Sequence, residues 1–229
     1  MATSRVILFG ATGMVGQGVL RECLLDPDVT AVLSVVRSAS AGSASATSDK
    51  VREIVADNFY DLSGMQREFE GYDACFFCLG VSSFGRKEPE YRHITVDITL
   101  SAAHAILQAN PASSGSGITF VYISGAGTNA NGRQMWARVK GETESALLAL
   151  PFKSVYLFRP GVIVPLDGIK SKTAAYRISY TVLKPLLPLL LQAFPKAVTS
   201  TRQIGRAMLH VATQGYPKQV LEAKDIATL

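Results

Sequence analysis

The stretch VILFGATGMVG, Val6–Gly16, decides the fold of this chain. Its first four residues are apolar without interruption, which predicts a strand covered on both faces. Glycines follow at three-residue spacing, and apolar residues then recur with helical periodicity. A strand, a tight glycine turn and a helix start together provide what a dinucleotide pyrophosphate needs, namely close backbone approach and free N–H groups. The alternative, a glycine-rich turn in an α/β protein without a cofactor, is disfavoured because both flanks meet the structural condition.

Composition places the chain among globular proteins with one domain. It has 229 residues, of which 48% are hydrophobic and 18% charged, and its net charge is +5. Because no run of five basic residues occurs, the charge does not indicate nucleic-acid binding. Three cysteines cannot form a disulfide framework, and the N-terminus leads straight into the first strand rather than into a secretory signal. These features predict a cytoplasmic protein.

The end of the second predicted strand bears on the choice of nucleotide. Ala31–Val36 is an apolar strand pattern that follows a helix over Met14–Leu25, and it ends at Arg37 and Ser38. An acidic residue at this point binds the ribose 2′-hydroxyl of NAD, whereas an arginine accommodates the 2′-phosphate of NADP. A guanidinium holds phosphate with paired hydrogen bonds, and the serine adds another. The pattern favours NADP, with a solvated surface arginine as the alternative.

The remaining elements alternate between strand and helix, as in a parallel α/β sheet. The further strands are predicted over Val51–Ala56, Ala74–Leu79, Ile118–Ile123, Ser154–Arg159 and Gln219–Leu221. The further helices are predicted over Leu62–Phe69, Tyr91–Ala109, Trp136–Leu150 and Thr199–Ala212, the last capped by Thr199 or Ser200. Asp57 follows the third strand, where it either reaches the adenine ring or caps the next turn.

Two features suggest functions that we do not favour. Cys75 and Cys78 have the spacing of a redox pair, but residues three apart on a strand point to opposite faces, so both are predicted to be core cysteines. The leucine-rich segment Tyr176–Phe194 contains two prolines and a lysine, and its uninterrupted apolar run is shorter than the ~18 residues of a membrane span. A substrate-side helical cap or a dimer surface is preferred there, with membrane-surface contact as a lesser alternative. No cluster of His, Cys or Asp has metal-ligand spacing.

Several short motifs, spread over nearly the whole chain, resemble those of one protein family. They are Gly10–Gly16, Val36-Arg37, Cys78-Leu79-Gly80, Ile123-Ser124, Val139–Glu142 and Phe158–Gly161. In this order they resemble short-chain dehydrogenases/reductases of the atypical, extended-like branch. The resemblance is strongest to the Tat-interacting oxidoreductases and the NmrA-like NAD(P)-binding proteins.

The resemblance implies the roles of individual residues. In that family a serine orients the substrate oxygen, a tyrosine exchanges a proton with it, and a lysine four residues later binds the nicotinamide ribose. Ser124 and Lys140 match two of these positions, but the tyrosine position holds Trp136. An indole N–H donates a hydrogen bond but is no usable acid or base, and no motif places Tyr91 or Tyr122 as a substitute.

The predicted cofactor-binding residues combine the glycine turn, the Arg37 position and the family motifs. They are Gly10, Thr12, Gly13, Met14, Val15, Gly16, Arg37, Ser38, Asp57, Leu79, Gly80, Lys140, Arg159, Pro160 and Gly161. The predicted fold is a Rossmann-type, doubly wound parallel sheet in one domain over residues 1–229. Residues from about 160 onward form a small C-terminal elaboration on the substrate side.

Two functions compete. The first is an oxidoreductase that uses NADP, with NADPH preferred over NADH, on a small carbonyl or alcohol. The second is a catalytically weak NADP(H)-binding sensor or scaffold that regulates a protein partner, which Trp136 favours. The expected partners are accordingly a small substrate or a protein, with no nucleic acid and no transmembrane span. The chain is expected to be a monomer or a homodimer.

Overall fold

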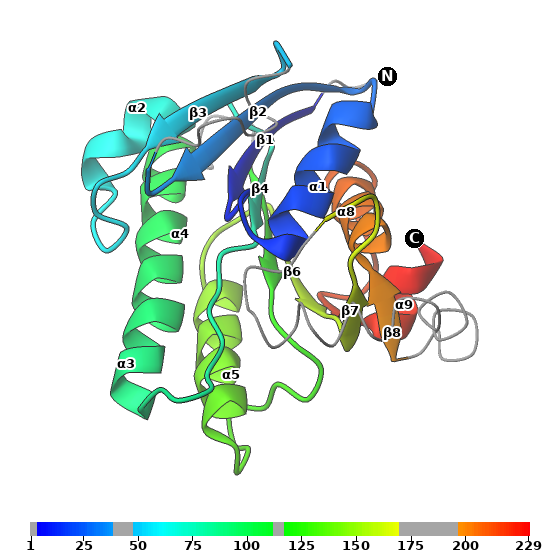
Figure 1. The fold of residues 1–229 in the computed structure, drawn as a ribbon. Helices are drawn as coiled ribbons and strands as arrows, with labels where there is room; N and C mark the ends of the chain where they lie inside the picture. The colour runs from blue at the N-terminus through cyan, green and yellow to red at the C-terminus, as the bar shows by residue number, and fades with distance from the viewer. Residues whose placement is uncertain (1–3, 39–47, 112–116, 170–196) are drawn as a thin grey trace.

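The computed structural model describes residues 4–38, 48–111, 117–169 and 197–229 (Figure 1). The segment Tyr176–Phe194 and most of the small polar loop that precedes Val51 lie outside the described residues. Within the described ranges, no helix is both long and apolar enough to cross a membrane. The same ranges contain no group of three or more His, Cys, Asp or Glu side chains placed to hold a metal ion.

A seven-stranded parallel sheet forms the centre of the molecule. Its strand order is β3-β2-β1-β4-β5-β6-β9, so the order reverses between β1 and β4. This is the doubly wound arrangement predicted from the sequence, and ligands of such sheets bind at the carboxyl ends of the strands where the order reverses. The strands are β1 Ser4–Phe9, β2 Val29–Val36, β3 Val51–Val55, β4 Ala74–Phe77, β5 Thr119–Ile123, β6 Ser154–Arg159 and β9 Val220–Glu222.

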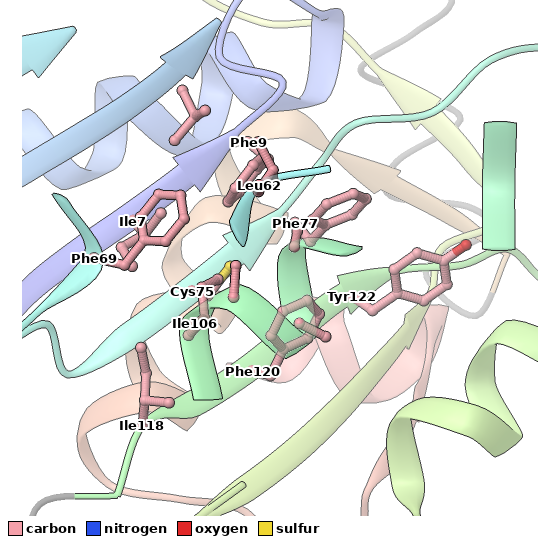
Figure 2. Packing of buried hydrophobic residues seen from close by; sticks show 14 of the residues in the cluster. Ile7, Phe9, Leu62, Phe69, Cys75, Phe77, Ile106, Ile118, Phe120 and Tyr122 are labelled. Carbon is pink, nitrogen blue, oxygen red and sulfur yellow. The ribbon is translucent and has the colours of Figure 1, made fainter. Parts of the chain in front are cut away.

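Helices cover both faces of the sheet (Figure 1). On one face lie α1 Met14–Leu25, α8 Thr201–Thr213 and α9 Ala223–Thr228, and on the other η2 Ser63–Met65, α2 Gln66–Phe69, α3 Glu88–Arg92, η3 His93–Asp97, α4 Ile98–Ala109 and α5 Met135–Leu148. A hydrophobic core lies on each face of the sheet, and successive residues of a strand point into opposite cores. Phe9 and Phe77 pack on the α4 side, which Figure 2 shows, and Leu8 and Phe76 pack on the α1 side. The unbroken apolar strands are therefore explained by burial on both faces.

Three features of the fold differ from the sequence-based expectation. Strand β4 ends at Phe77, two residues early, because its partner β1 ends at Phe9, the residue that pairs with Phe77. The predicted helix Tyr91–Ala109 begins earlier, at Glu88, and contains one π-helical turn over His93–Asp97. A second, two-stranded sheet pairs β7 Val162–Val164 with β8 Val198–Ser200, and these three-residue strands are too short to give a periodic pattern.

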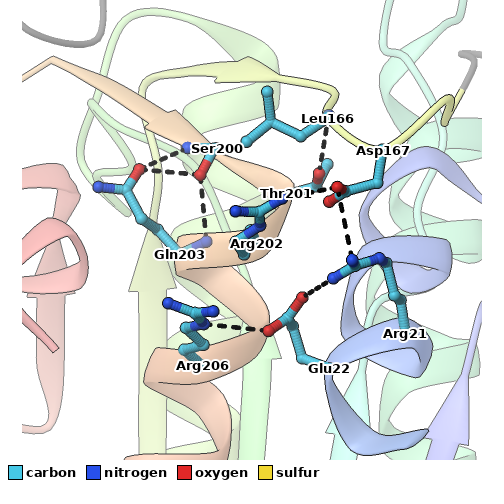
Figure 3. A network of polar contacts seen from close by, with 9 residues as sticks. All are labelled: Arg21, Glu22, Leu166, Asp167, Ser200, Thr201, Arg202, Gln203 and Arg206. Carbon is cyan, nitrogen blue, oxygen red and sulfur yellow. Dashed lines mark hydrogen bonds and ion pairs between the residues drawn. The ribbon is translucent and has the colours of Figure 1, made fainter. Parts of the chain in front are cut away.

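The contact between α1 and α8 ties the N-terminal turn to the C-terminal part of the chain. A Cβ atom on Gly18 would lie 2.6 Å from Thr201 Cβ, and one on Gly205 would lie 2.8 Å from Glu22 Cγ. The two helices therefore approach more closely than larger residues allow. The carboxylate of Glu22, which is buried, accepts hydrogen bonds from Arg206 Nε at 3.0 Å and from Arg21 at 2.6 Å (Figure 3).

The start of α8 confirms one of the two predicted caps. The Ser200 hydroxyl accepts a hydrogen bond from the Gln203 backbone N–H at 3.1 Å, while the Gln203 side chain accepts one from the Ser200 N–H at 2.9 Å (Figure 3). This reciprocal pair is a capping box, which satisfies two backbone donors at the helix start.

The cysteines are core residues, as predicted. Cys75 packs in the core on the α4 side and Cys78 against the core on the α1 side, so the sheet separates their thiols. All three cysteines are free. Burial raises the pKa of the Cys23 thiol to about 12 and raises the pKa values of Cys75 and Cys78 as well, which keeps all three protonated and unreactive.

Candidate functional site

The glycine turn forms a tight cradle between β1 and α1. Gly10 has φ +82°, a conformation that favours glycine, and a Cβ there would lie 2.7 Å from the Leu79 backbone nitrogen. A Cβ on Gly16 would lie 2.0 Å from the Gly10 carbonyl oxygen. The Gly13 N–H donates to the same oxygen at 2.9 Å. Each of the three glycines thus contributes to a turn that brings the start of α1 close to β1 and β4.

The N-terminus of α1 is open to an anion. Gly13 is the N-cap, no side chain caps the helix, and the first turn carries no acidic residue. Thr12 lies in the turn, where its carbonyl accepts a hydrogen bond from Gln17 Nε2 at 3.1 Å, and Met14 and Val15 begin the helix. The N–H groups of the first helical turn have no carbonyl partner within the helix. Together with the glycine cradle, this arrangement is of the kind that accommodates a pyrophosphate.

The residues predicted to contact the adenosine half lie at two neighbouring strand ends. Arg37 and Ser38 follow β2, Asp57 follows β3, and Val36 pairs with Val55 across these strands. All three side chains are exposed. No ion pair of Arg37 forms within the part of the chain that the structure describes, so its guanidinium is available to a phosphate there.

Leu79 and Gly80 come directly after β4, which pairs with β1. The Cys78 N–H donates to the Phe9 carbonyl at 3.0 Å, so the segment stays beside β1 as far as the glycine turn. A Cβ on Gly80 would meet no atom within 4 Å. Close packing against protein therefore does not require a glycine at this position, which borders open space.

Ser124 is held by two sets of hydrogen bonds at the end of β5. It is 6% exposed, and its backbone N–H donates to the Phe158 carbonyl at 2.8 Å. Its hydroxyl lies 2.9 Å from the Thr128 hydroxyl, which itself donates to the Gly125 carbonyl at 2.8 Å. The sequence analysis missed Thr128, because only the folded loop brings the two hydroxyls together.

Lys140 places its amine beside the same strand end. Its Nζ donates to the carbonyls of Ile123 and Ser124 at 3.2 Å each, and it lies 5.4 Å from the centroid of the Tyr122 ring. Burial lowers the pKa of Lys140 to about 8, against the opposing effect of Glu144 one helical turn later. The structure thus brings Ser124 and Lys140 together, as the family resemblance implied.

Trp136 lies one helical turn before Lys140 and beside the loop that follows Ser124. Cβ atoms built on Gly125 and Gly127 would lie 3.8 and 3.6 Å from its six-membered ring. The indole also packs against a small cluster that contains Tyr91. Its position beside the serine loop agrees with the place of the family tyrosine.

Neither tyrosine considered as a substitute has the properties of an acid at this site. Tyr91 and Tyr122 are both buried, and burial raises the pKa of each phenol. An elevated pKa makes a phenol a poorer proton donor near neutral pH. The ring of Tyr122 instead faces the Lys140 amine.

Arg159, which was predicted to lie beside the cofactor, is held by two carboxylates. Its guanidinium forms a two-pronged ion pair with the buried carboxylate of Glu144 and a further contact with Glu222 at 3.4 Å. It therefore joins β6 to α5 and β9. The side chain borders a cavity of about 500 Å³ on the flank of α5, whose lining includes Glu144 and Thr128. The sequence analysis missed Glu144, although its place four residues after Lys140 puts it on the same helix face.

Pro160 and Gly161 support the loops around the site through their backbones. The Ala126 N–H donates to the Pro160 carbonyl at 3.0 Å, which holds the loop after Ser124 against the end of β6. A Cβ on Gly161 would lie 2.2 Å from the Ala197 carbonyl oxygen. Gly161 is thus needed where the chain enters the small β7–β8 sheet.

Sequence comparisons identify two kinds of relative, while no protein-family model matches the chain. Protein fmp52, mitochondrial, of Emericella nidulans is 28% identical over 163 residues, which cover 70% of this chain and 67% of the relative. Protein HTATIP2 of Rattus norvegicus is 27% identical over 164 residues, which cover 72% of this chain and 64% of the relative.

The names of the fmp52 relatives correct the predicted localisation. Related proteins from Emericella nidulans, Aspergillus fumigatus and Scheffersomyces stipitis are all named as mitochondrial. The prediction of a cytoplasmic protein is therefore wrong on this comparison. It rested on cysteine content and on the N-terminal residues, neither of which distinguishes one reducing compartment from another.

Solved structures share the fold. Gre2 of Candida albicans, in complex with NADPH, superposes with a TM-score of 0.71 at 14% identity, covering 96% of this chain and 78% of that one. A short-chain dehydrogenase/reductase from Burkholderia thailandensis superposes with a TM-score of 0.66 at 16% identity, covering 99% and 94%. The chain thus resembles HTATIP2 and the fmp52 proteins in sequence and has the Rossmann-type fold of the short-chain dehydrogenases/reductases.

Proposed function

We propose that this protein is an NADP(H)-dependent oxidoreductase that acts on a small carbonyl or alcohol. The observation that carries the proposal is the combination of an uncapped, glycine-lined helix start with Ser124 at the end of β5 and Lys140 on α5, whose amine reaches that strand end. The first feature suits a pyrophosphate and the second suits the nicotinamide half and its substrate. When bound, the nucleotide supplies the hydride. Lys140 would bind the ribose, and Ser124 would orient the substrate oxygen.

Trp136 favours a second function, that of an NADP(H)-binding sensor or scaffold. Trp136 occupies the place of the proton-transferring tyrosine, and losing a positioned general acid typically costs about 10²–10⁴ in rate. A protein with an intact nucleotide cradle and no such acid suits a sensor or scaffold that changes its affinity for a protein partner when NADP(H) binds. Both proposed functions are compatible with either a monomer or a homodimer. The names of the fmp52 relatives make mitochondria the compartment that we propose for either function.

Titration with NADPH and NADH, followed by tryptophan fluorescence, tests nucleotide binding directly. Trp136 is the single tryptophan of the chain and lies beside the proposed nicotinamide position, so bound NADPH is expected to quench its emission by energy transfer. Saturable quenching, tighter for NADPH than for NADH, is the expected result. Absence of quenching by both nucleotides, with no nucleotide bound in equilibrium dialysis, would contradict both proposed functions.

Arg37→Ala tests the nucleotide preference. We expect it to weaken NADPH binding by about 1.5–3 kcal/mol, the range of hydrogen bonds to charged groups, and to leave NADH binding nearly unchanged. The matched control is Arg67→Ala, which removes an arginine from α2 rather than from the end of β2. An unchanged ratio of NADPH to NADH affinity in Arg37→Ala would overturn the assignment of the 2′-phosphate to this residue.

A further inference from the structure

The cavity of about 500 Å³ between α5, β6 and β9 has no part in the proposed function. Its lining combines the apolar side chains of Leu148, Leu157 and Val220 with the ion pair of Glu144 and Arg159. Leu148 is exposed, so the cavity is open to solvent beside that residue. A volume of this size lies within the range of small-molecule sites, about 300–1,000 Å³.

The cavity is separate from the glycine turn and from the candidate catalytic side chains. Its described lining comes from the loop after β5, from α5, β6 and β9, and includes no residue of β1, α1 or the segment after β4. Ser124, Trp136 and Lys140 do not line it either. A molecule bound in this cavity would therefore occupy a second site.

The charged side chains at the cavity leave one negative charge uncompensated. The carboxylates of Glu144 and Glu222 both contact the one guanidinium of Arg159. Glu222 lies on the same face of β9 as Val220, because residues two apart on a strand point to the same side. Its side chain is 43% exposed and is 3.4 Å from Arg159. The amine of Lys140 is bonded to backbone carbonyls at the end of β5 and does not line the cavity. These charges favour a cationic ligand and disfavour an anionic one.

The polar groups of the lining also have hydrogen-bond acceptors to spare. A carboxylate has about four lone-pair sites, and within the described ranges Glu144 accepts two bonds, both from Arg159. The exposed Ser145 hydroxyl donates to the Gly141 carbonyl at 3.0 Å, so its lone pairs stay available. An ammonium group has three donors and no acceptor, which suits such a set of partners.

We propose that this cavity binds an organic cation, namely a primary ammonium group attached to an apolar body about the size of an indole ring. The ammonium group lies at the carboxylates of Glu144 and Glu222. The apolar body packs against Leu148, Leu157 and Val220, which removes its surface from water. Binding involves no covalent step and needs no nucleotide, so the proposal stands independently of the proposed oxidoreductase or sensor function.

The experiment titrates the full-length, nucleotide-free protein at neutral pH with three indoles in a calorimeter. Tryptamine, tryptophol and indole-3-acetate share the ring but carry an ammonium, a hydroxyl and a carboxylate group. Tryptamine is expected to bind about tenfold more tightly than tryptophol, the gain of a hydrogen bond to a charged group over a neutral one. Indole-3-acetate is expected to bind more weakly than both. Equal affinities for the three indoles, or no binding of tryptamine, would overturn the proposal.

Three variants locate the bound amine. Ser145→Trp fills the cavity from an exposed position of α5 and is expected to lower the tryptamine affinity at least about tenfold. Ala149→Trp, its matched control, adds the same ring at an exposed residue outside the lining and is expected to bind tryptamine as the wild type does.

Glu222→Gln removes one negative charge but keeps an oxygen that can cap α9, as the Glu222 side chain does. It is expected to weaken tryptamine binding by about fivefold and to leave tryptophol binding unchanged. Tryptamine binding that survives Ser145→Trp, or that Glu222→Gln leaves unchanged, would overturn the proposal.

Discussion

Gly16→Ala is expected to lower the free energy of unfolding by about 3 kcal/mol and to weaken NADPH binding by about a hundredfold or more. The added methyl group would lie 2.0 Å from the Gly10 carbonyl oxygen, a distance at which the two atoms overlap. This oxygen belongs to backbone, so no side chain can rotate away to relieve the contact. The start of α1 must shift from β1, and that shift opens the turn that is proposed to hold the pyrophosphate.

Denaturant unfolding and NADPH titration measure the two effects separately. Gly64→Ala is the matched control, because a Cβ there would meet no atom within 4 Å and Gly64 lies in η2, outside the proposed cofactor site. It is expected to unfold at nearly the same denaturant concentration as the wild type. If Gly16→Ala also unfolds at the denaturant concentration of the wild type and binds NADPH with unchanged affinity, the glycine turn is not tight at Gly16.

Trp136→Tyr is expected to raise NADPH oxidation with small aldehydes by about 10²–10⁴. The substitution places a phenol one helical turn before Lys140, whose positive charge favours the ionised phenol and so lowers its pKa. A phenol with a lowered pKa can transfer a proton to the substrate oxygen, which the indole cannot do. The measurement is the loss of NADPH absorbance with a panel of aldehydes.

Trp136→Phe separates the new acid from the removal of the indole. It makes a similar change in size but adds no hydroxyl group, so no gain in rate is expected. If Trp136→Tyr folds, binds NADPH and still shows no gain over Trp136→Phe, the site lacks a latent catalytic arrangement. The sensor or scaffold function would then be the better proposal.

The doubly wound parallel sheet could be predicted from the sequence because the signals for its strands and its glycine turn are local. The apolar runs of β1, β5 and β6 indicate strands buried on both faces, and each strand ends at or directly before one of the family-like motifs. The glycine turn is equally local, since its three glycines act on one another within seven residues. Ser124 and Lys140 meet because α5 lies along the end of β5, where the Lys140 amine donates to the carbonyls of Ile123 and Ser124.

The side-chain contacts around the site could not be predicted from the sequence, because they depend on how separate segments fold together. Arg159 was assigned to the cofactor from its motif, yet it is bound by Glu144 and Glu222, one of which lies on a helix and the other on the edge strand. No pattern in the sequence indicates that these three residues meet. The bond between Ser124 and Thr128 likewise depends on the path of one irregular loop.

The contact between α1 and α8 has a consequence for the synthesis of the protein. Glu22 and Arg206 are 184 residues apart, and apolar residues of α1 share one core cluster with those of α8. While the ribosome has made only the N-terminal half, this part of α1 exposes apolar surface and a carboxylate without its later partner. Contacts of such long sequence separation form slowly, so the nascent chain is open to aggregation during this interval.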